Sequence, residues 1–259
     1  MTRRTLRIPL ALALLLLGLF LPGFVLFGKE PTDLQLFLLI GQSNMAGRGK
    51  VEAADQVPHP RILMLDKNNA WVPAMDPVHF DKPKIAGVGL CSEFARCVVA
   101  AEPQTVVGLV PCAFGGTTLD QWRPGSALYT NAVARMRAAM QNGRLRAILW
   151  HQGEGDSSAA KTATYPVRFS AMIAQLRSDL NAPDVPVLVG ELGHYRDAYA
   201  GFNAMLPQAV QAVPNSARVS SEGLGANNDN VHFNREALIT FGRRYFEAYE
   251  KLRKAAGQR

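Results

Sequence analysis

Cysteine is scarce in this sequence of 259 residues, and the three cysteines present do not form a zinc-binding pattern. Cys91, Cys97 and Cys112 are odd in number, with no Cys-x-x-Cys pair and no histidines at zinc-finger spacing. Cys91 and Cys97 are six residues apart in a predicted helix, so they point to different faces and are expected to act as small buried apolar side chains. A disulfide that includes Cys112 stays open.

Runs of lysine and arginine are also lacking, and this argues against nucleic-acid binding. The chain has 28 Lys and Arg against 21 Asp and Glu, a formal net charge of +7. Arg3, Arg4 and Arg7 lie in an N-terminal segment, and without them the net charge is +4. This small excess is spread along the chain, so it affects solubility and surface potential and forms no phosphate-binding patch.

One long apolar run stands near the N-terminus. Pro9 to Phe27 is 19 residues without a charge. That length just reaches the roughly 20 residues that span a bilayer as a helix, whereas a cleavable signal has a shorter apolar region of about 7 to 15 residues. We therefore favour an uncleaved anchor over a cleaved signal, although Pro22-Gly23 argues against a continuous helix.

Residues 1–29 are thus interpreted as a membrane anchor or signal segment, and residues 30–259 as one domain without repeats or low-complexity linkers. Basic residues before the apolar run place the N-terminus in the cytoplasm. The domain is then expected to be extracytoplasmic, tethered to the inner membrane or secreted to the periplasm. Nothing in the sequence indicates the oligomeric state.

Apolar, β-branched runs alternate with helical patterns along residues 30–259. Strands that are apolar on both faces and alternate with helices are typical of a parallel sheet covered on both sides. The sequence therefore predicts the α/β class, as one three-layer α/β/α domain with a mainly parallel central sheet; the segment Lys50–Lys84 is interpreted as an irregular insertion. The expected strands are Leu34–Ile40, Arg61–Leu65, Thr105–Pro111, Leu145–Trp150, Val185–Leu192 and Ala217–Ser220, and the expected helices are Ser92–Ala101, Ser126–Gln141, Tyr165–Leu180, Ala198–Val213 and Asn234–Ala255.

In such sheets ligands bind at the carboxyl ends of the strands. Directly after the first predicted strand comes Gly41-Gln42-Ser43-Asn44-Met45. A serine in this position exposes its hydroxyl and leaves main-chain N–H groups free for a bound oxygen. The motif is neither a Gly-x-Ser-x-Gly elbow nor a phosphate-binding loop, and on its own such a serine is more often part of a turn or a helix cap than a nucleophile.

Two adjacent glycines, Gly115 and Gly116, follow the third predicted strand. Glycines allow a ligand to approach the backbone closely and can offer an N–H group to a developing oxyanion. A loop that needs positive φ is the alternative.

The segment His151-Gln152-Gly153-Glu154 follows the fourth predicted strand. A zinc site would need two histidines at i and i+4 on a helix, which this glycine-containing stretch lacks. Gln152 is better explained as an amide donor, and Glu154 and Asp156 as acceptors that organise the loop.

Asp229 and His232 precede the last predicted helix and are three residues apart. A single turn brings the carboxylate against the imidazole N–H, which leaves the other ring nitrogen to take a proton from a hydroxyl. A serine needs such a base to attack an ester at neutral pH. An isolated Asp-x-x-His pair is otherwise a helix-capping arrangement.

Together the four segments resemble the four blocks of the sialate O-acetylesterase-like branch of the SGNH hydrolase superfamily, which includes carbohydrate acetylesterases. The resemblance extends from Leu34 to the last helix, and the blocks occur in the family's order. Gly41-Gln42-Ser43-Asn44-Met45 replaces the usual Gly-Asp-Ser-Leu, and Gln152 stands where an asparagine is usual; both are typical of this branch.

The resemblance implies a flavodoxin-like fold and deacetylation through an acyl-enzyme, without metal or cofactor. It implies that Ser43 is the nucleophile, His232 the general base and acid, and Asp229 the group that orients it. The implied oxyanion hole consists of the N–H groups of Ser43 and Gly116, or of Gly115 if the register is shifted by one, and the amide of Gln152. Gly115, Asn44 and Glu154 are expected to support this site.

The implied substrate is an acetylated carbohydrate, and the sequence does not choose sialic acid over xylan. Aromatic faces with a few polar groups suit a sugar ring. Trp122 and Arg123 are therefore tentative substrate-binding residues, with Trp71, His194 and Tyr195 as further candidates for the rim.

Two other functions stay open. The first is a non-catalytic carbohydrate-binding envelope protein on the same fold, because fold does not fix function. The second is a metal-dependent phosphoesterase that uses His151, Glu154, Asp229 and His232.

Overall fold

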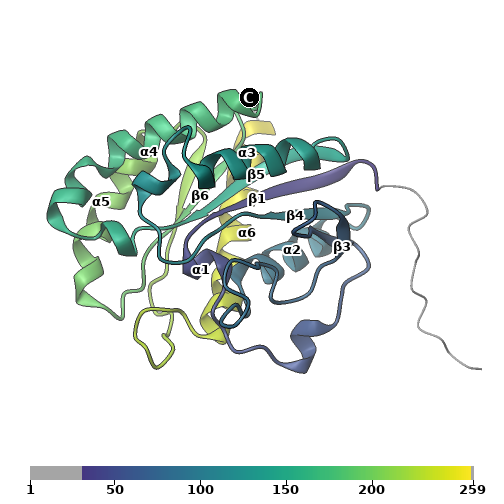
Figure 1. The fold of residues 1–259 in the computed structure, drawn as a ribbon, viewed down its shortest axis with the longest axis horizontal. Coiled ribbons are helices and arrows are strands. Elements are labelled where there is room, and N and C mark those ends of the chain that lie inside the picture. Colours follow the sequence, from purple (N-terminus) through teal and green to yellow (C-terminus); the bar gives the residue numbers. More distant parts are fainter. Residues whose placement is uncertain (1–30, 258–259) are drawn as a thin grey trace, which may run out of the picture.

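The structure, a computed structural model, describes residues 31–257. Seven strands form one sheet in the order β3-β2-β4-β1-β5-β6-β7, with helices on both faces (Figure 1). All neighbouring strands are parallel except β2 and β3. The predicted three-layer α/β/α fold is confirmed. The strands are β1 (Leu34–Gly41), β2 (Ile62–Leu65), β3 (Trp71–Pro73), β4 (Val107–Pro111), β5 (Gly143–His151), β6 (Val187–Gly190) and β7 (Ser216–Val219), and the α-helices are α1 (Ser43–Ala46), α2 (Leu90–Ala101), α3 (Ala127–Ala139), α4 (Ala159–Asp179), α5 (Ala200–Gln211) and α6 (Arg235–Gly257).

The expected membrane anchor or signal segment, residues 1–29, lies outside the described residues. Within residues 31–257, no helix has the length and apolar character needed to cross a membrane.

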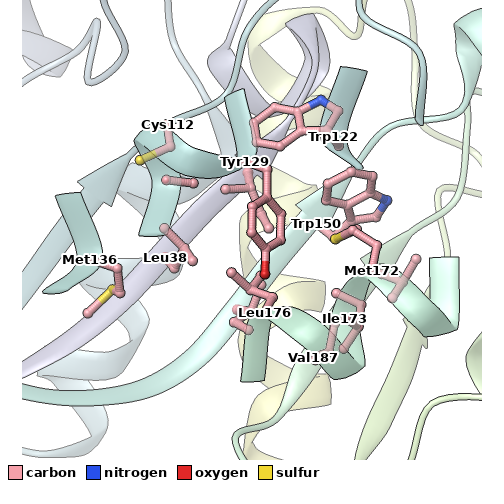
Figure 2. Packing of buried hydrophobic residues seen from close by; sticks show 14 of the residues in the cluster. Leu38, Cys112, Trp122, Tyr129, Met136, Trp150, Met172, Ile173, Leu176 and Val187 are labelled. Atoms are coloured by element: carbon pink, nitrogen blue, oxygen red, sulfur yellow. The ribbon is translucent and has the colours of Figure 1, made fainter. Parts of the chain in front are cut away.

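Strand β1 is the centre of the sheet because both of its faces are apolar. Its side chains alternate between two buried clusters: Leu36 and Leu38 belong to the first, Phe37 and Leu39 to the second. Helices α3, α4 and α5 cover the first cluster, and α2 and α6 cover the second (Figure 1). The first cluster contains Trp122 and Trp150, which lie side by side in Figure 2.

The chain order of the strands reverses at β1. After β1 the chain forms β2, β3 and β4 on one side of it, and then β5, β6 and β7 on the other. The carboxyl ends of β4, β1 and β5 are therefore neighbours, and such a switch point is where open α/β sheets bind ligands.

The structure adds an edge strand that the sequence analysis did not expect. Strand β3 contains only three residues and pairs antiparallel with β2. The expectation that Trp71 lies at the rim of the site is wrong. Its indole donates to Asn142 Oδ1 at 3.0 Å, and Asn142 directly precedes β5. The indole therefore reaches toward the amino edge of the sheet, although the Trp71 main chain pairs with Leu65 at the end of β2.

The cysteines are all free. Cys91 and Cys112 are buried, and Cys97 is half-buried. Cys91 belongs to the second apolar cluster and Cys112 to the first. Both buried thiols thus have the small apolar role expected for Cys91, and Cys112 forms no disulfide.

Candidate active site

Ser43 lies at the carboxyl end of the central strand, directly after a turn that requires glycine. Gly41 has φ +129°, and a Cβ atom on it would lie 2.1 Å from the carbonyl oxygen of His151 on β5. No other residue fits there, because such a contact with backbone cannot be relieved by a side-chain movement. The turn carries the chain into α1, whose first residue is Ser43, only 6% exposed.

The structure brings Ser43, His232 and Asp229 together. Ser43 Oγ is 2.9 Å from His232 Nε2, and His232 Nδ1 is 2.6 Å from Asp229 Oδ2. Asp229 Oδ1 also accepts the main-chain N–H groups of Val231 and His232, each at 2.9 Å. The carboxylate thus closes a single turn around the histidine, as the three-residue spacing predicts.

This arrangement fixes the proton positions on the imidazole. Partial burial by itself raises the pKa of Asp229, but hydrogen bonds from the His232 main chain and ring hold that pKa below its usual value. The ionised carboxylate only accepts, so the proton lies on Nδ1. His232 Nε2 is then free to accept the proton of the Ser43 hydroxyl.

Asn44 ties the serine turn to the histidine loop. Its side-chain amide donates to Glu154 Oε1 at 2.6 Å and to the carbonyl oxygen of Val231 at 3.3 Å. Its side-chain oxygen accepts the N–H of Phe233 at 3.0 Å. One buried side chain therefore holds the residues on both sides of His232, and Tyr195 Oη donates to the same Val231 oxygen at 2.9 Å.

The glycine loop after β4 runs directly against Ser43. A Cβ atom on Gly115 would lie 3.3 Å from Ser43 Cβ. The N–H of Gly115 donates to Asp81 Oδ2 at 2.9 Å, so it is not available to a bound oxygen. Neither Ser43 nor Gly116, which has φ +80°, donates its N–H to another group within residues 31–257. Of the two glycines considered for the expected oxyanion hole, only Gly116 therefore keeps its N–H free within residues 31–257.

A buried ion pair supports the glycine loop after β4. Arg48 Nη2 lies 2.7 Å from Asp81 Oδ2, and the two side chains are 5% and 1% exposed. Burial alone raises the pKa of Asp81, but Arg48 and the Gly115 N–H together bring that pKa below its usual value. The sequence analysis missed both residues because nothing in their 33-residue separation signals a contact.

The side-chain amide of Gln152 is not free to serve as the expected oxyanion donor. Its side chain is fully buried, and its amide nitrogen donates to the Thr117 carbonyl oxygen at 3.2 Å and to Asp156 Oδ2 at 2.6 Å. Its side-chain oxygen accepts from Tyr165 Oη at 3.0 Å. Because both amide hydrogens are used, Gln152 supports the glycine loop through Thr117 and offers no free donor to a bound oxygen.

The tentative substrate-binding role of Trp122 is also wrong. Trp122 is 1% exposed and packs edge-on against Trp150 with ring centroids 5.6 Å apart (Figure 2). A capping box between Thr118 and Gln121 turns this segment inward. Arg123 is exposed and lines a surface hollow with Asp120, Gln121, Ser126, Ala127 and Leu128, none of which belongs to the serine site.

His194 and Tyr195 have separate positions. His194 Nε2 lies 3.0 Å from the buried carboxylate of Glu191, and the histidine lines a second hollow. Tyr195 packs edge-on against Phe233 at 5.4 Å and reaches the histidine loop through its hydroxyl. Tyr195 therefore supports the site, although the sequence analysis placed it at the rim.

The residues considered for a metal site are used within the protein. His151 is fully buried, and its Nε2 lies 2.9 Å from the Glu191 carbonyl oxygen. Burial lowers its pKa, so this histidine is neutral, and its Nδ1 lies 3.8 Å from Glu154 Oε1. Over residues 31–257, no three or more His, Cys, Asp or Glu side chains are grouped to hold a metal ion.

Comparisons with known proteins agree with this architecture. The model of the family described as carbohydrate esterase, sialic acid-specific acetylesterase, matches residues 33–251. A probable carbohydrate esterase of Arabidopsis thaliana is 33% identical over 242 residues, which cover 83% of this chain and 90% of that protein. A crystal structure of an Arabidopsis thaliana protein has a TM-score of 0.77 at 32% identity and covers 85% of this chain and 98% of its own.

A more distant neighbour shows the same fold. The crystal structure of NanS has a TM-score of 0.71 at 19% identity, covering 88% of this chain and 99% of its own. The resemblance indicated by the four sequence segments is confirmed by the family match. The chain belongs to the carbohydrate esterase family of sialic acid-specific acetylesterases, and it is a carbohydrate O-acetylesterase.

Proposed function

We propose that the enzyme removes O-acetyl groups through an acetyl-serine intermediate on Ser43. The observation that carries this proposal is the continuous hydrogen-bonded series from Ser43 Oγ to His232 and Asp229, with distances of 2.9 and 2.6 Å. A hydroxyl, an imidazole and a carboxylate in this order are what nucleophilic attack on an ester requires.

In the first step Ser43 Oγ forms a bond to the acetyl carbonyl carbon while its proton moves to His232 Nε2. The carbonyl oxygen becomes an oxyanion, which accepts from the N–H groups of Ser43 and Gly116. Preorganised donors of this kind contribute about 100-fold to 1000-fold each to the rate. The bond to the sugar oxygen then breaks, and His232 returns the proton to the departing alkoxide.

In the second step water takes the place of the sugar. His232 Nε2 accepts a proton from the water as its oxygen bonds to the acetyl carbon. The bond to Ser43 Oγ breaks, acetate leaves, and the serine regains its proton. Asp229 stays ionised throughout and stabilises the imidazolium that forms in each step.

Hydrolysis of 4-nitrophenyl acetate tests this proposal. We expect Ser43→Ala to lower kcat at least about 1000-fold, because the residual rate comes from main-chain donors and binding alone. Ser170→Ala, at a half-buried position of α4, is the matched control and keeps the rate. A folded Ser43→Ala enzyme with the activity of the control would disprove the acyl-enzyme route.

We also propose that the enzyme acts outside the cytoplasm. The apolar run Pro9–Phe27 supports this location. Fractionation of cells that express the full chain tests the location; recovery of the enzyme in the cytoplasm would contradict it.

A further inference from the structure

Two exposed aromatic residues belong to the chain segments that meet at the glycine loop beside Ser43. Over residues 31–257, the exposed large hydrophobic side chains include only two aromatic rings, Phe80 and Phe114, which are 37% and 41% exposed. Single exposed apolar residues are common on protein surfaces, so their exposure alone decides nothing. Their position is informative, because Phe114 directly precedes Gly115, the residue that packs against Ser43.

The segment that carries Phe80 runs along the glycine loop. Asp81 Oδ2 accepts the N–H of Gly115 at 2.9 Å, which fixes the next residue to Phe80 against that loop. A Cβ atom on Gly116 would lie 3.7 Å from Lys82 Nζ. Phe80 and Lys82 therefore flank, on either side of Asp81, the loop that supplies the proposed oxyanion donor.

The ring of Phe80 packs against the buried side chain of Arg135. The guanidinium carbon of Arg135 lies 5.1 Å from the ring centroid, a cation–π contact. Arg135 is itself 6% exposed and donates to the Leu65 and Asp66 carbonyl oxygens and to Asn69 Oδ1. A fixed ring that remains more than a third exposed gives a binding surface that loses little conformational entropy when a ligand covers it.

The ammonium group of Lys82 lies next to the glycine loop. Its side chain is exposed and makes no ion pair or hydrogen bond with the part of the chain that the structure describes. An ammonium offers three donors to oxygen atoms. Apolar rings next to a free donor match a sugar ring, which has an apolar C–H face and oxygen substituents around it.

We propose that Phe114 and Phe80 form the platform for the sugar ring that carries the acetyl group, and that Lys82 donates to an oxygen of the same sugar. This inference rests on the proposed function of Ser43. It assigns substrate recognition to residues 80–82 and 114, in place of Trp122 and Arg123.

The test compares acetyl esters that carry a sugar with one that does not. KM and kcat are measured by acetate release for an O-acetylated sialic acid, an acetylated xylo-oligosaccharide and ethyl acetate, which has no sugar ring. For Phe114→Ala we expect KM for the two sugars to rise about 10-fold with kcat within about twofold, because removing an interaction that stabilises substrate and transition state equally changes KM alone. The constants for ethyl acetate stay unchanged, and Phe114→Tyr restores the sugar KM.

Lys82→Gln distinguishes the oxygen that the ammonium contacts. A rise in KM for the acidic sugar alone indicates a carboxylate partner, and an equal rise for both sugars indicates a hydroxyl; either result supports the inference. Val167→Ala and Lys251→Gln are the matched controls: Val167 is an exposed apolar side chain on α4, and Lys251 lies about 24 Å along α6 from its first residue.

Sugar KM values that change no more in the Phe114 and Lys82 variants than in these controls would overturn the inference. Failure of the proposed function has a different signature, because Ser43→Ala would then retain hydrolysis of ethyl acetate as well as of the sugars.

Discussion

At the scale of single residues, Asn44 bears on the reaction without touching the reacting atoms. It donates to Glu154 and Val231 and accepts from Phe233, so it sets the position of His232 relative to the adjacent Ser43. A nucleophile and a base must be held within a fraction of an ångström of their working distance. Asn44 is therefore a positioning residue.

We expect Asn44→Ala to lower kcat about 10-fold to 100-fold with little change in KM, because the loop that carries His232 loses two of its hydrogen bonds. Steady-state kinetics together with urea unfolding check this. Asn203→Ala is the matched control: Asn203 is also buried and also clamps a main chain, at Leu192, outside the serine site. An Asn44→Ala enzyme that is destabilised as much as Asn203→Ala but keeps its kcat would show a purely structural role.

At the scale of secondary-structure elements, helices α2 and α6 pack so closely that a glycine is required between them. A Cβ atom on Gly242 of α6 would lie 2.4 Å from the Leu90 carbonyl oxygen and 2.9 Å from the Phe94 nitrogen of α2. Both atoms belong to a helix backbone, so they cannot move away independently. This packing fixes the helix that follows the His232 loop.

We expect Gly242→Ala to lower the free energy of unfolding by about 2 kcal/mol or more, even though alanine favours a helix over glycine by about 1 kcal/mol. Gly201→Ala in α5 is the control, since a Cβ atom there meets nothing within 4 Å, and we expect it to be neutral or stabilising. Urea denaturation of both variants measures the difference. Equal stabilities for the two would contradict the close packing of α2 and α6.

The strands, and the site segments that follow them, could be predicted from the sequence. Each of the predicted apolar, β-branched strands is present in the sheet, and the segments with Ser43, with Gly115–Gly116 and with Gln152 follow β1, β4 and β5 as expected. The pair Asp229 and His232 meets because a spacing of three residues closes one turn, which is a local property. The three-residue spacing of Asp229 and His232, and the rule that ligands bind at the carboxyl ends of parallel strands, together predict the parts of the site.

Other features depend on tertiary contacts that no local pattern reveals. Strand β3 is only three residues long and exists because β2 offers it an edge. The sequence places Trp122 in a loop, but its side chain packs against Trp150 and is buried in the core. Helix α4 begins at Ala159, six residues before the predicted start at Tyr165. Pro166 lies inside this helix and removes one main-chain hydrogen bond, but it does not end the helix. The alanines of the first turn favour the helix at its start.

Gln152 shows the limit of transferring a role by position. Its place after β5 is as expected, but the carboxylate of Asp156 and the hydroxyl of Tyr165 occupy its amide group. These partners come from the next loop and from α4, and only the folded chain brings them there. Its amide nitrogen also donates to the Thr117 carbonyl oxygen, which follows the two glycines of the loop.

At the scale of the whole molecule, the order of the strands explains why four separate segments share one site. Neighbouring strands β4, β1 and β5 deliver three of them to one edge of the sheet. The fourth comes from the connection between β7 and α6 and is fastened to the others through Asn44 and Tyr195. The Ser43 hydroxyl and the His232 imidazole, which are 189 residues apart in the chain, thereby meet at 2.9 Å.

Covalent labelling of the intact protein by a fluorophosphonate tests this convergence most directly, because the reagent forms a stable bond only with a serine activated by a neighbouring base. We predict one label per chain, located on Ser43 by peptide mass mapping, with labelling lost in Ser43→Ala and slowed at least about 100-fold in His232→Ala. A label on a different residue, or equal labelling rates with and without the His232 imidazole, would contradict the account.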